Sequence, residues 1–119
     1  MLRKRVLLVD DEETILAVLQ RYAEKLGCEA LLAYNGAEAL DILGIEQVDM
    51  VVTDVAMPRM DGLTLAKRVK ELYPDILVVG ISGKVDPSKE TLPFDVFLGK
   101  PFDFRQLSEA LTGGLGRKG

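Results

Sequence analysis

Five short apolar runs recur along the chain, and the segments between them space their apolar residues differently. Residues 6–9 read Val-Leu-Leu-Val and residues 76–81 read Ile-Leu-Val-Val-Gly-Ile, without alternating polar positions. Continuous apolar runs of this length are typical of strands buried on both faces, as in a parallel sheet. The pattern predicts strands over residues 3–9, 29–34, 48–53, 76–81 and 96–98.

The segments between the strands carry helical spacing. Apolar residues recur every three or four positions from Ile15 to Leu26, and Gly27 follows as a stop signal. The same reasoning predicts helices over residues 15–26, 37–43, 63–72 and 102–111, the last ended by Gly113 and Gly114. Because strands and helices alternate, the chain is predicted to form right-handed βαβ units, that is, an α/β fold with helices on both faces of a parallel sheet.

The stretch between the fourth and fifth strands departs from this regular pattern. Pro87 can begin a helix with Asp86 as its cap, but Pro93 ends it almost at once, and Leu92 is its clear apolar anchor. So short a helix is marginal in water without strong packing. A short, mobile or irregular helix is therefore predicted across residues 84–94.

Composition suits one domain of 119 residues, because 48% of them are hydrophobic. The net charge of −4 is too mild for general binding of nucleic acid or membrane surfaces. There is no secretory signal pattern and no apolar stretch long enough to span a bilayer, so a cytoplasmic location is expected. The single cysteine, Cys28, is expected to be a buried, reduced thiol. The chain has no histidine, which excludes histidine-based acid–base chemistry and histidine metal sites.

Polar side chains gather where the predicted strands end. The residues concerned are Asp10 and Asp11 after the first strand, Asp54 after the third, Ser82 after the fourth, and Lys100-Pro101 after the fifth. In open parallel sheets the ligand lies beyond the carboxyl ends of the strands, where the strand order reverses. This concentration favours a functional site over scattered helix caps. Glu12 and Glu13 are instead assigned to capping, since the helix dipole favours negative charge there.

In this order and on this strand pattern, the residues resemble the receiver domains of bacterial two-component response regulators. The resemblance rests on Asp10-Asp11, the segment Asp54-Val-Ala-Met-Pro-x-Met-Asp-Gly62, Ser82, Phe97 and Lys100-Pro101, and it covers residues 4–111. It implies a flavodoxin-like, doubly wound (βα)5 fold with strand order 2-1-3-4-5. It also implies a receiver domain over residues 1–112, followed by a flexible Gly-rich tail or the start of a linker over residues 113–119.

The resemblance further implies a phosphorylation-dependent signalling switch. Asp54 would accept a phosphoryl group from a histidine kinase or a phosphotransfer protein, in a reaction that depends on Mg²⁺, with Mn²⁺ as an alternative. Asp10, Asp11, Asp54 and the backbone carbonyl of Ala56 would hold the metal. This chemistry is physically sound, because crowded carboxylates repel one another unless a hard cation joins them. Phosphoryl transfer itself depends mainly on positioning and charge neutralisation.

Other residues are expected to bind the phosphoryl group or to shape its site. Ser82 and Lys100 would bind phosphoryl oxygens. Phe97 is expected as a core residue, as strand phenylalanines normally are, and also as the aromatic that turns inward on phosphorylation in the family. Pro58, Gly62 and Pro101 would shape the site, with Pro101 corresponding to a cis proline of the family. Ala56 and Lys84 would border the path of the water that removes the phosphoryl group.

The expected output surface comprises the fourth and fifth strands and the last two helices. If the helix over residues 84–94 is short, dimerisation through this surface should be weak and the unphosphorylated protein monomeric. The chain would catalyse only its own phosphorylation and dephosphorylation, and it would bind neither nucleic acid nor membranes.

Three alternatives stay open at this point. One is a pseudo-receiver that serves only for docking. Another is a small aspartyl-phosphate phosphatase of the haloacid dehalogenase type, although the sequence Asp10-Asp11-Glu12 lacks that family's second aspartate two residues after the nucleophile. The third is a flavodoxin-like nucleotide binder, which Asp10 and Asp11 disfavour because they would repel a phosphate.

Overall fold

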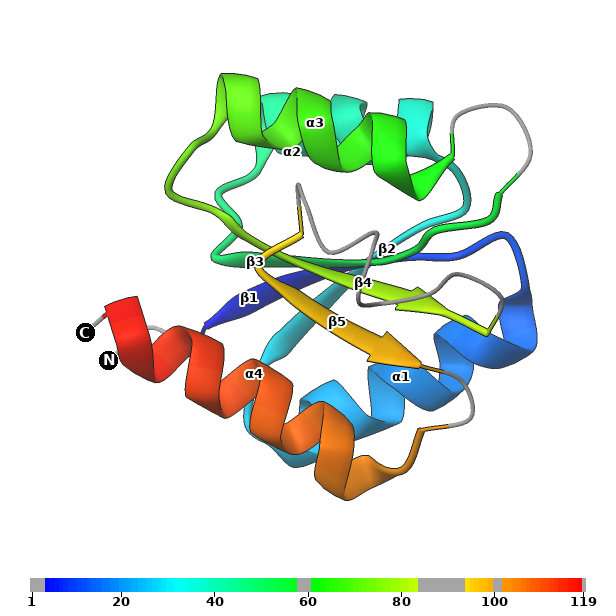
Figure 1. The fold of residues 1–119 in the computed structure, drawn as a ribbon, viewed down its shortest axis with the longest axis vertical. Helices are drawn as coiled ribbons and strands as arrows, with labels where there is room; N and C mark the ends of the chain where they lie inside the picture. The colour runs from blue at the N-terminus through cyan, green and yellow to red at the C-terminus, as the bar shows by residue number, and fades with distance from the viewer. Residues whose placement is uncertain (1–3, 58–60, 84–93, 100–101, 119) are drawn as a thin grey trace.

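A parallel sheet forms the middle layer of the protein in the computed structural model, which describes residues 4–57, 61–83, 94–99 and 102–118 (Figure 1). Its strands are β1 (Arg5–Val9), β2 (Glu29–Ala33), β3 (Met50–Asp54), β4 (Leu77–Ser82) and β5 (Val96–Gly99). They are hydrogen-bonded in the order β2-β1-β3-β4-β5, and every neighbouring pair is parallel. The predicted fold class and strand order are confirmed.

Helices cover both faces of the sheet. They are α1 (Glu13–Lys25), α2 (Gly36–Ile45), α3 (Gly62–Leu72) and α4 (Phe104–Lys118). Figure 1 shows α1 and α4 on one face and α2 and α3 on the other. Within the described part of the chain, no helix has the length and apolar character needed to cross a bilayer.

The last helix differs from its prediction at both ends. It begins at Phe104 rather than at residue 102, and it continues through Gly113 and Gly114 to Lys118. The predicted stop at these glycines was wrong, because a glycine lowers helix stability by about 1 kcal/mol but does not forbid helical geometry. The predicted short helix over residues 84–94 lies outside the described residues, except for Phe94. The division into a receiver domain over residues 1–112 and a flexible tail stays a prediction.

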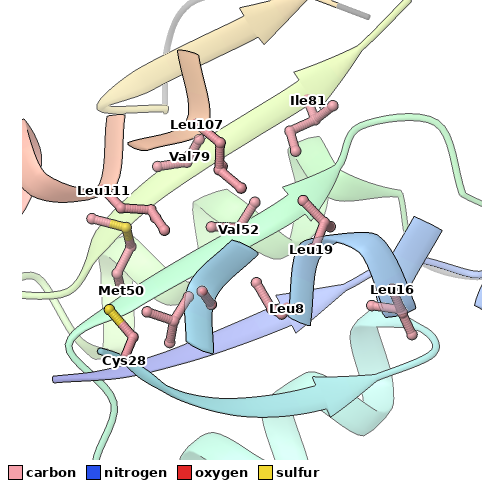
Figure 2. Packing of buried hydrophobic residues seen from close by; sticks show 12 residues of the cluster. Leu8, Leu16, Leu19, Cys28, Met50, Val52, Val79, Ile81, Leu107 and Leu111 are labelled. Atoms are coloured by element: carbon pink, nitrogen blue, oxygen red, sulfur yellow. The ribbon is translucent and has the colours of Figure 1, made fainter. Parts of the chain in front are cut away.

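Two apolar clusters explain why the strands lack polar alternation. Leu8, Leu19 and Leu107 belong to the cluster between the sheet and helices α1 and α4, part of which Figure 2 shows. Leu7 and Leu65 belong to the cluster between the sheet and helices α2 and α3. Successive side chains of β1 point to opposite faces of the sheet. Because each face is covered by a cluster, the side chains on both faces must be apolar. Each fully buried leucine contributes about 1.5–3 kcal/mol through burial.

The single cysteine lies in the first of these clusters. Cys28 is only 4% exposed, and Figure 2 shows it beside Met50, with Leu111 of α4 close by. It forms no disulfide. The expected buried thiol is therefore confirmed.

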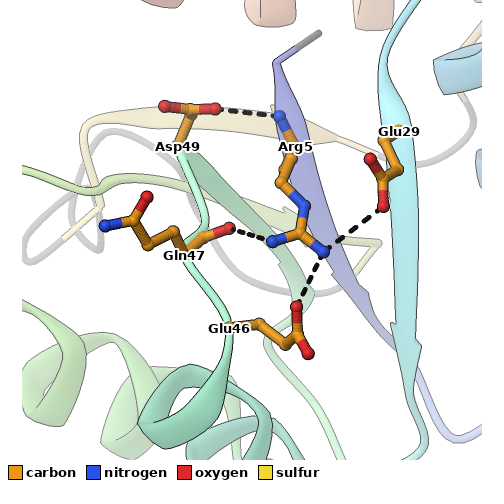
Figure 3. Close-up of polar contacts among 5 residues, drawn as sticks. All are labelled: Arg5, Glu29, Glu46, Gln47 and Asp49. Carbon is orange, nitrogen blue, oxygen red and sulfur yellow. Dashed lines mark hydrogen bonds and ion pairs between the residues drawn. The ribbon is translucent and has the colours of Figure 1, made fainter. Parts of the chain in front are cut away.

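Arg5 joins three segments at the amino-terminal end of the sheet, where Glu29, Glu46, Gln47 and Asp49 surround it (Figure 3). One guanidinium nitrogen donates to Glu46 at 2.8 Å and to Glu29 at 3.3 Å, and the other donates to the carbonyl of Gln47 at 3.0 Å. The backbone N–H of Arg5 donates to the carboxylate of Asp49 at 2.8 Å. The bond to Glu46 is the largest of the effects that raise the pKa of Arg5, so this guanidinium stays charged. These contacts hold the start of β1 against β2 and the segment that leads into β3.

Candidate functional site

Three carboxylates meet at the carboxyl edge of the sheet. Asp10 directly follows β1 and is 1% exposed, whereas Asp54 is the last residue of β3 and is 6% exposed. Val9 of β1 pairs with Thr53 of β3, so the residues that follow them, Asp10 and Asp54, lie side by side. Asp11 is exposed beside them, and one oxygen of each carboxylate lies within 4.8 Å of the others. The predicted acidic cluster is thus brought together by parallel pairing.

Asp10 is held by the backbone at both sides. Its carboxylate accepts a hydrogen bond of 2.9 Å from the N–H of Glu12, and its own N–H donates to the carbonyl of Ala33 at 3.2 Å. Glu12 occupies the N-cap position of α1, but its side chain makes no capping hydrogen bond. Glu12 therefore does not cap α1 through its side chain, although its charge stands at the helix end that the dipole favours. Glu13 lies in the first turn, where the dipole favours its charge.

Asp54 is oriented by the turn that follows it. The N–H of Ala56 donates to Oδ1 of Asp54 at 3.3 Å, and the buried hydroxyl of Thr53 donates to the backbone carbonyl of Asp54 at 2.9 Å. The N–H of Gly62 donates to the carbonyl of Val55 at 2.8 Å. A Cβ on Gly62 would overlap the carbonyl oxygen of Asp54 and lie 2.7 Å from Cα of Val55. Only glycine therefore lets the start of α3 lie this close to the backbone of Asp54.

Ser82 and Phe97 lie on the two neighbouring strands. Ser82 ends β4 and is 3% exposed, and the preceding residue pairs with Asp54. It therefore lies at the same edge as the carboxylates. Phe97 is partly buried in β5 and packs on the cluster beneath α2 and α3. Of the other expected site residues, Ala56 is exposed, whereas Pro58, Lys84, Lys100 and Pro101 lie outside the described residues.

Phe94 is a neighbour of the site that the sequence analysis missed. It is 5% exposed, and its ring occupies the space beside Gly80 of β4. The available signal was Gly80 itself, because a glycine inside an apolar strand often marks a close approach by another part of the chain. The identity of the approaching residue could not be read from this signal, since Phe94 is distant in sequence.

The donor set of the acidic cluster fits a hard divalent cation. Mg²⁺ prefers carboxylate and carbonyl oxygens and keeps several waters. Two of the three carboxylates are buried and one is exposed, so protein oxygens line one side of the cluster while the other side is open to solvent. This acidic pocket can hold a metal ion.

The model of the response regulator receiver domain matches residues 6–112. The chain belongs to this family. Receiver domains work in two-component signalling, and phosphorylation and Mg²⁺ binding are typical of them. The resemblance drawn from the sequence motifs is thereby confirmed, for the family as for the fold.

Similar proteins include a receiver protein that this chain covers almost completely and a much longer sensor kinase. The response regulator receiver protein CpdR of Brucella abortus is 34% identical over 108 residues, which cover 87% of this chain and 90% of that protein. The autoinducer 1 sensor kinase/phosphatase LuxN of Vibrio campbellii is 40% identical over 79 residues, 66% of this chain. The chain spans only 9% of the length of LuxN. The response regulator protein TrrA of Thermotoga maritima, solved in complex with Mg²⁺-BeF, is 28% identical with a TM-score of 0.87, covering 93% of this chain and 98% of that one.

The close approach of α3 to Asp54 generates a stability prediction. We expect Gly62→Ala to lower the free energy of unfolding by about 1–3 kcal/mol or more, because the added methyl group overlaps backbone atoms that cannot move independently. Gly44→Ala in α2 is the matched control, since a Cβ there meets nothing within 4 Å. It should stabilise the protein by about 0.5–1 kcal/mol. Urea unfolding of both variants measures the two effects, and similar stabilities would contradict the prediction.

Proposed function

We propose that this receiver domain is a phosphorylation-dependent signalling switch in which Asp54 accepts the phosphoryl group and Mg²⁺ is required. The observation that carries the proposal is the cluster of three carboxylates from neighbouring strands, with oxygens within 4.8 Å of one another. Such a cluster would be costly without a cation to join its charges, and it lies where parallel sheets bind their ligands. Membership of the receiver family supports phosphoryl transfer as the reaction at this cluster.

The transfer step follows from the chemistry of Asp54. An oxygen of its carboxylate attacks the phosphorus of the donor, forming a P–O bond as the bond from phosphorus to the donor breaks. The bonding electrons leave with the donor, which is a phosphohistidine nitrogen in a partner protein or the acyl oxygen of a small phosphodonor. The N–H of Ala56 helps to fix the orientation of the attacking group through its bond to Oδ1. Orientation of this kind supplies much of the catalysis of phosphoryl transfer.

The surrounding residues would stabilise the charge on the phosphoryl oxygens. Bound Mg²⁺, held by the three carboxylates and the carbonyl of Ala56, would neutralise part of this charge. The Ser82 hydroxyl would also bind a phosphoryl oxygen. Its position at the end of β4, next to the acidic cluster, supports this role. The family resemblance alone assigns Lys100 a contact with the phosphoryl group. It likewise assigns Pro58 and Pro101 their site-shaping roles. Ala56 and Lys84 are proposed to tune the rate of dephosphorylation by bordering the path of water.

The proposed partners are a histidine kinase or a histidine phosphotransfer protein on the donor side. The similarity to a region of LuxN, which is named a sensor kinase/phosphatase, supports this class of partner. On the output side, we propose a surface around β4, β5 and α4 whose conformation depends on phosphorylation. A cytoplasmic location and a monomeric unphosphorylated state belong to the same proposal.

The acceptor assignment predicts the outcome of a single substitution. Asp54→Asn should abolish phosphorylation by acetyl phosphate in the presence of Mg²⁺, because an amide is not a competent nucleophile. Asp41→Asn is the control, since Asp41 is an exposed carboxylate of α2 outside the cluster. It should be phosphorylated as the wild type is. Intact mass after incubation measures both, and a mass shift that persists in Asp54→Asn would place the acceptor elsewhere. A wild type that never gains mass would favour a pseudo-receiver used for docking.

The assignment of Asp11 as a metal ligand predicts a loss of Mg²⁺ affinity when its carboxylate is removed. Asp11→Ala should weaken Mg²⁺ binding by about tenfold or more, because it removes one of the carboxylates that would hold the ion. Glu12→Ala removes the adjacent carboxylate, which lies outside the cluster, and should change Mg²⁺ affinity far less. Calorimetric titration with Mg²⁺ compares them. Equal affinities of wild type and Asp11→Ala would rule Asp11 out as a ligand.

A further inference from the structure

Gly80 leaves a space in strand β4 that is filled by a side chain from another segment. A Cβ built on Gly80 would lie 2.7 Å from Cδ1 of Phe94 and within 2.9 Å of two further ring carbons. Carbon atoms in ordinary contact are about 3.5–4.0 Å apart. The ring of Phe94 therefore occupies the volume that any other residue at position 80 would need. Phe94 is 5% exposed and belongs to the cluster beneath α2 and α3.

The same ring contacts Phe97. The centroids of Phe94 and Phe97 are 5.7 Å apart at an interplanar angle of 80°, which is an edge-to-face arrangement. Phe97 also lies directly opposite Gly80 in the β4–β5 pair. Because Gly80 has no side chain, the ring of Phe94 can lie directly against β4 and pack beside the ring of Phe97.

This aromatic pair lies next to the part of β4 that ends at Ser82, a residue of the candidate phosphoryl site. Ser82 follows Gly80 by two residues in β4, so the two residues face the same side of the sheet. Ser82 is opposite Gly99, two residues beyond Phe97 in β5. Phe94 itself is not part of the cluster of Asp10, Asp11 and Asp54. Phe94 can act on that cluster through β4 or through Phe97, which its ring contacts.

We propose that Phe94 is a positioning residue of the phosphoryl site, whose ring fills the space beside Gly80 and holds Phe97 in its resting orientation. The inference rests on the proposed function together with the expectation, drawn from the family resemblance, that Phe97 changes its rotamer on phosphorylation. A turn of the Phe97 ring breaks its edge-to-face contact with Phe94. The contact therefore stabilises the resting conformation relative to the active one and lowers the apparent affinity for any ligand that selects the active state.

Beryllofluoride with Mg²⁺, an analogue of the phosphoryl group, is the probe for this test. Phe94→Leu should tighten its apparent binding by about two- to tenfold, the factor expected for loss of one edge-to-face aromatic contact in the resting state. Phosphorylation by acetyl phosphate should accelerate in the same variant. Phe94→Met is measured alongside, because an unbranched methionine fills irregular space and preserves the fold if leucine does not. Urea unfolding checks that each variant is folded.

Two controls separate positioning from a loss of packing. Leu43→Ala truncates a residue of α2 in the same cluster that is also 5% exposed, and it should lower stability without tightening the binding of beryllofluoride. In a Phe97→Leu background, Phe94→Leu should lose its effect on binding, because the residue through which it acts is gone.

The outcomes distinguish this inference from the proposed function. If wild type fails to bind beryllofluoride with Mg²⁺, the proposed function itself is wrong. If wild type binds it while Phe94→Leu and Phe94→Met bind no more tightly, the positioning role is overturned and the proposed function stands. A tightening that persists at full size in the Phe97→Leu background would also overturn the role, since Phe94 would then act independently of Phe97.

Discussion

Two buried carboxylates held side by side are the constraint on which this structure depends. Asp54 ends β3, and Asp10 directly follows the neighbouring parallel strand β1. Both are almost fully covered, so their charges repel at short range. Each accepts a backbone N–H, from Glu12 and from Ala56, which fixes its orientation and offsets part of its charge. The residual repulsion is what a divalent cation would relieve.

The rest of the fold keeps these carboxylates in register. The continuous apolar faces of β1 and β3 lock the two strands between clusters on both sides of the sheet. At the opposite edge Arg5 fixes the start of β1 through four contacts. Gly62 brings α3 against the backbone of Asp54, and Thr53 binds the carbonyl of the same residue. Asp54 is thus attached to well-packed elements, whereas Phe97 lies on the short edge strand β5, whose residues are partly buried or exposed.

Features that leave a pattern along the chain were predictable from the sequence, whereas contacts between segments distant in sequence were not. The strands were predictable because both of their faces are covered, and Asp10, Asp54 and Ser82 were predictable as strand ends. The extension of α4 through Gly113 and Gly114 was not, because glycines weaken a helix without fixing where it ends. The packing of Phe94 against Gly80 was also out of reach, since it joins separate segments and depends on the absence of a side chain.

The central claim is that Asp54 carries the phosphoryl group when Mg²⁺ is present, and chemical trapping tests it most directly. Borohydride reduces an acyl phosphate to an alcohol, which leaves homoserine in place of the aspartate that was phosphorylated. The wild-type protein is incubated with acetyl phosphate and Mg²⁺, reduced and mapped by peptide mass spectrometry, with a parallel sample in EDTA. Homoserine is expected in place of Asp54 with Mg²⁺, and none is expected with EDTA. Homoserine in place of another aspartate, or equal yields in both samples, would contradict the claim.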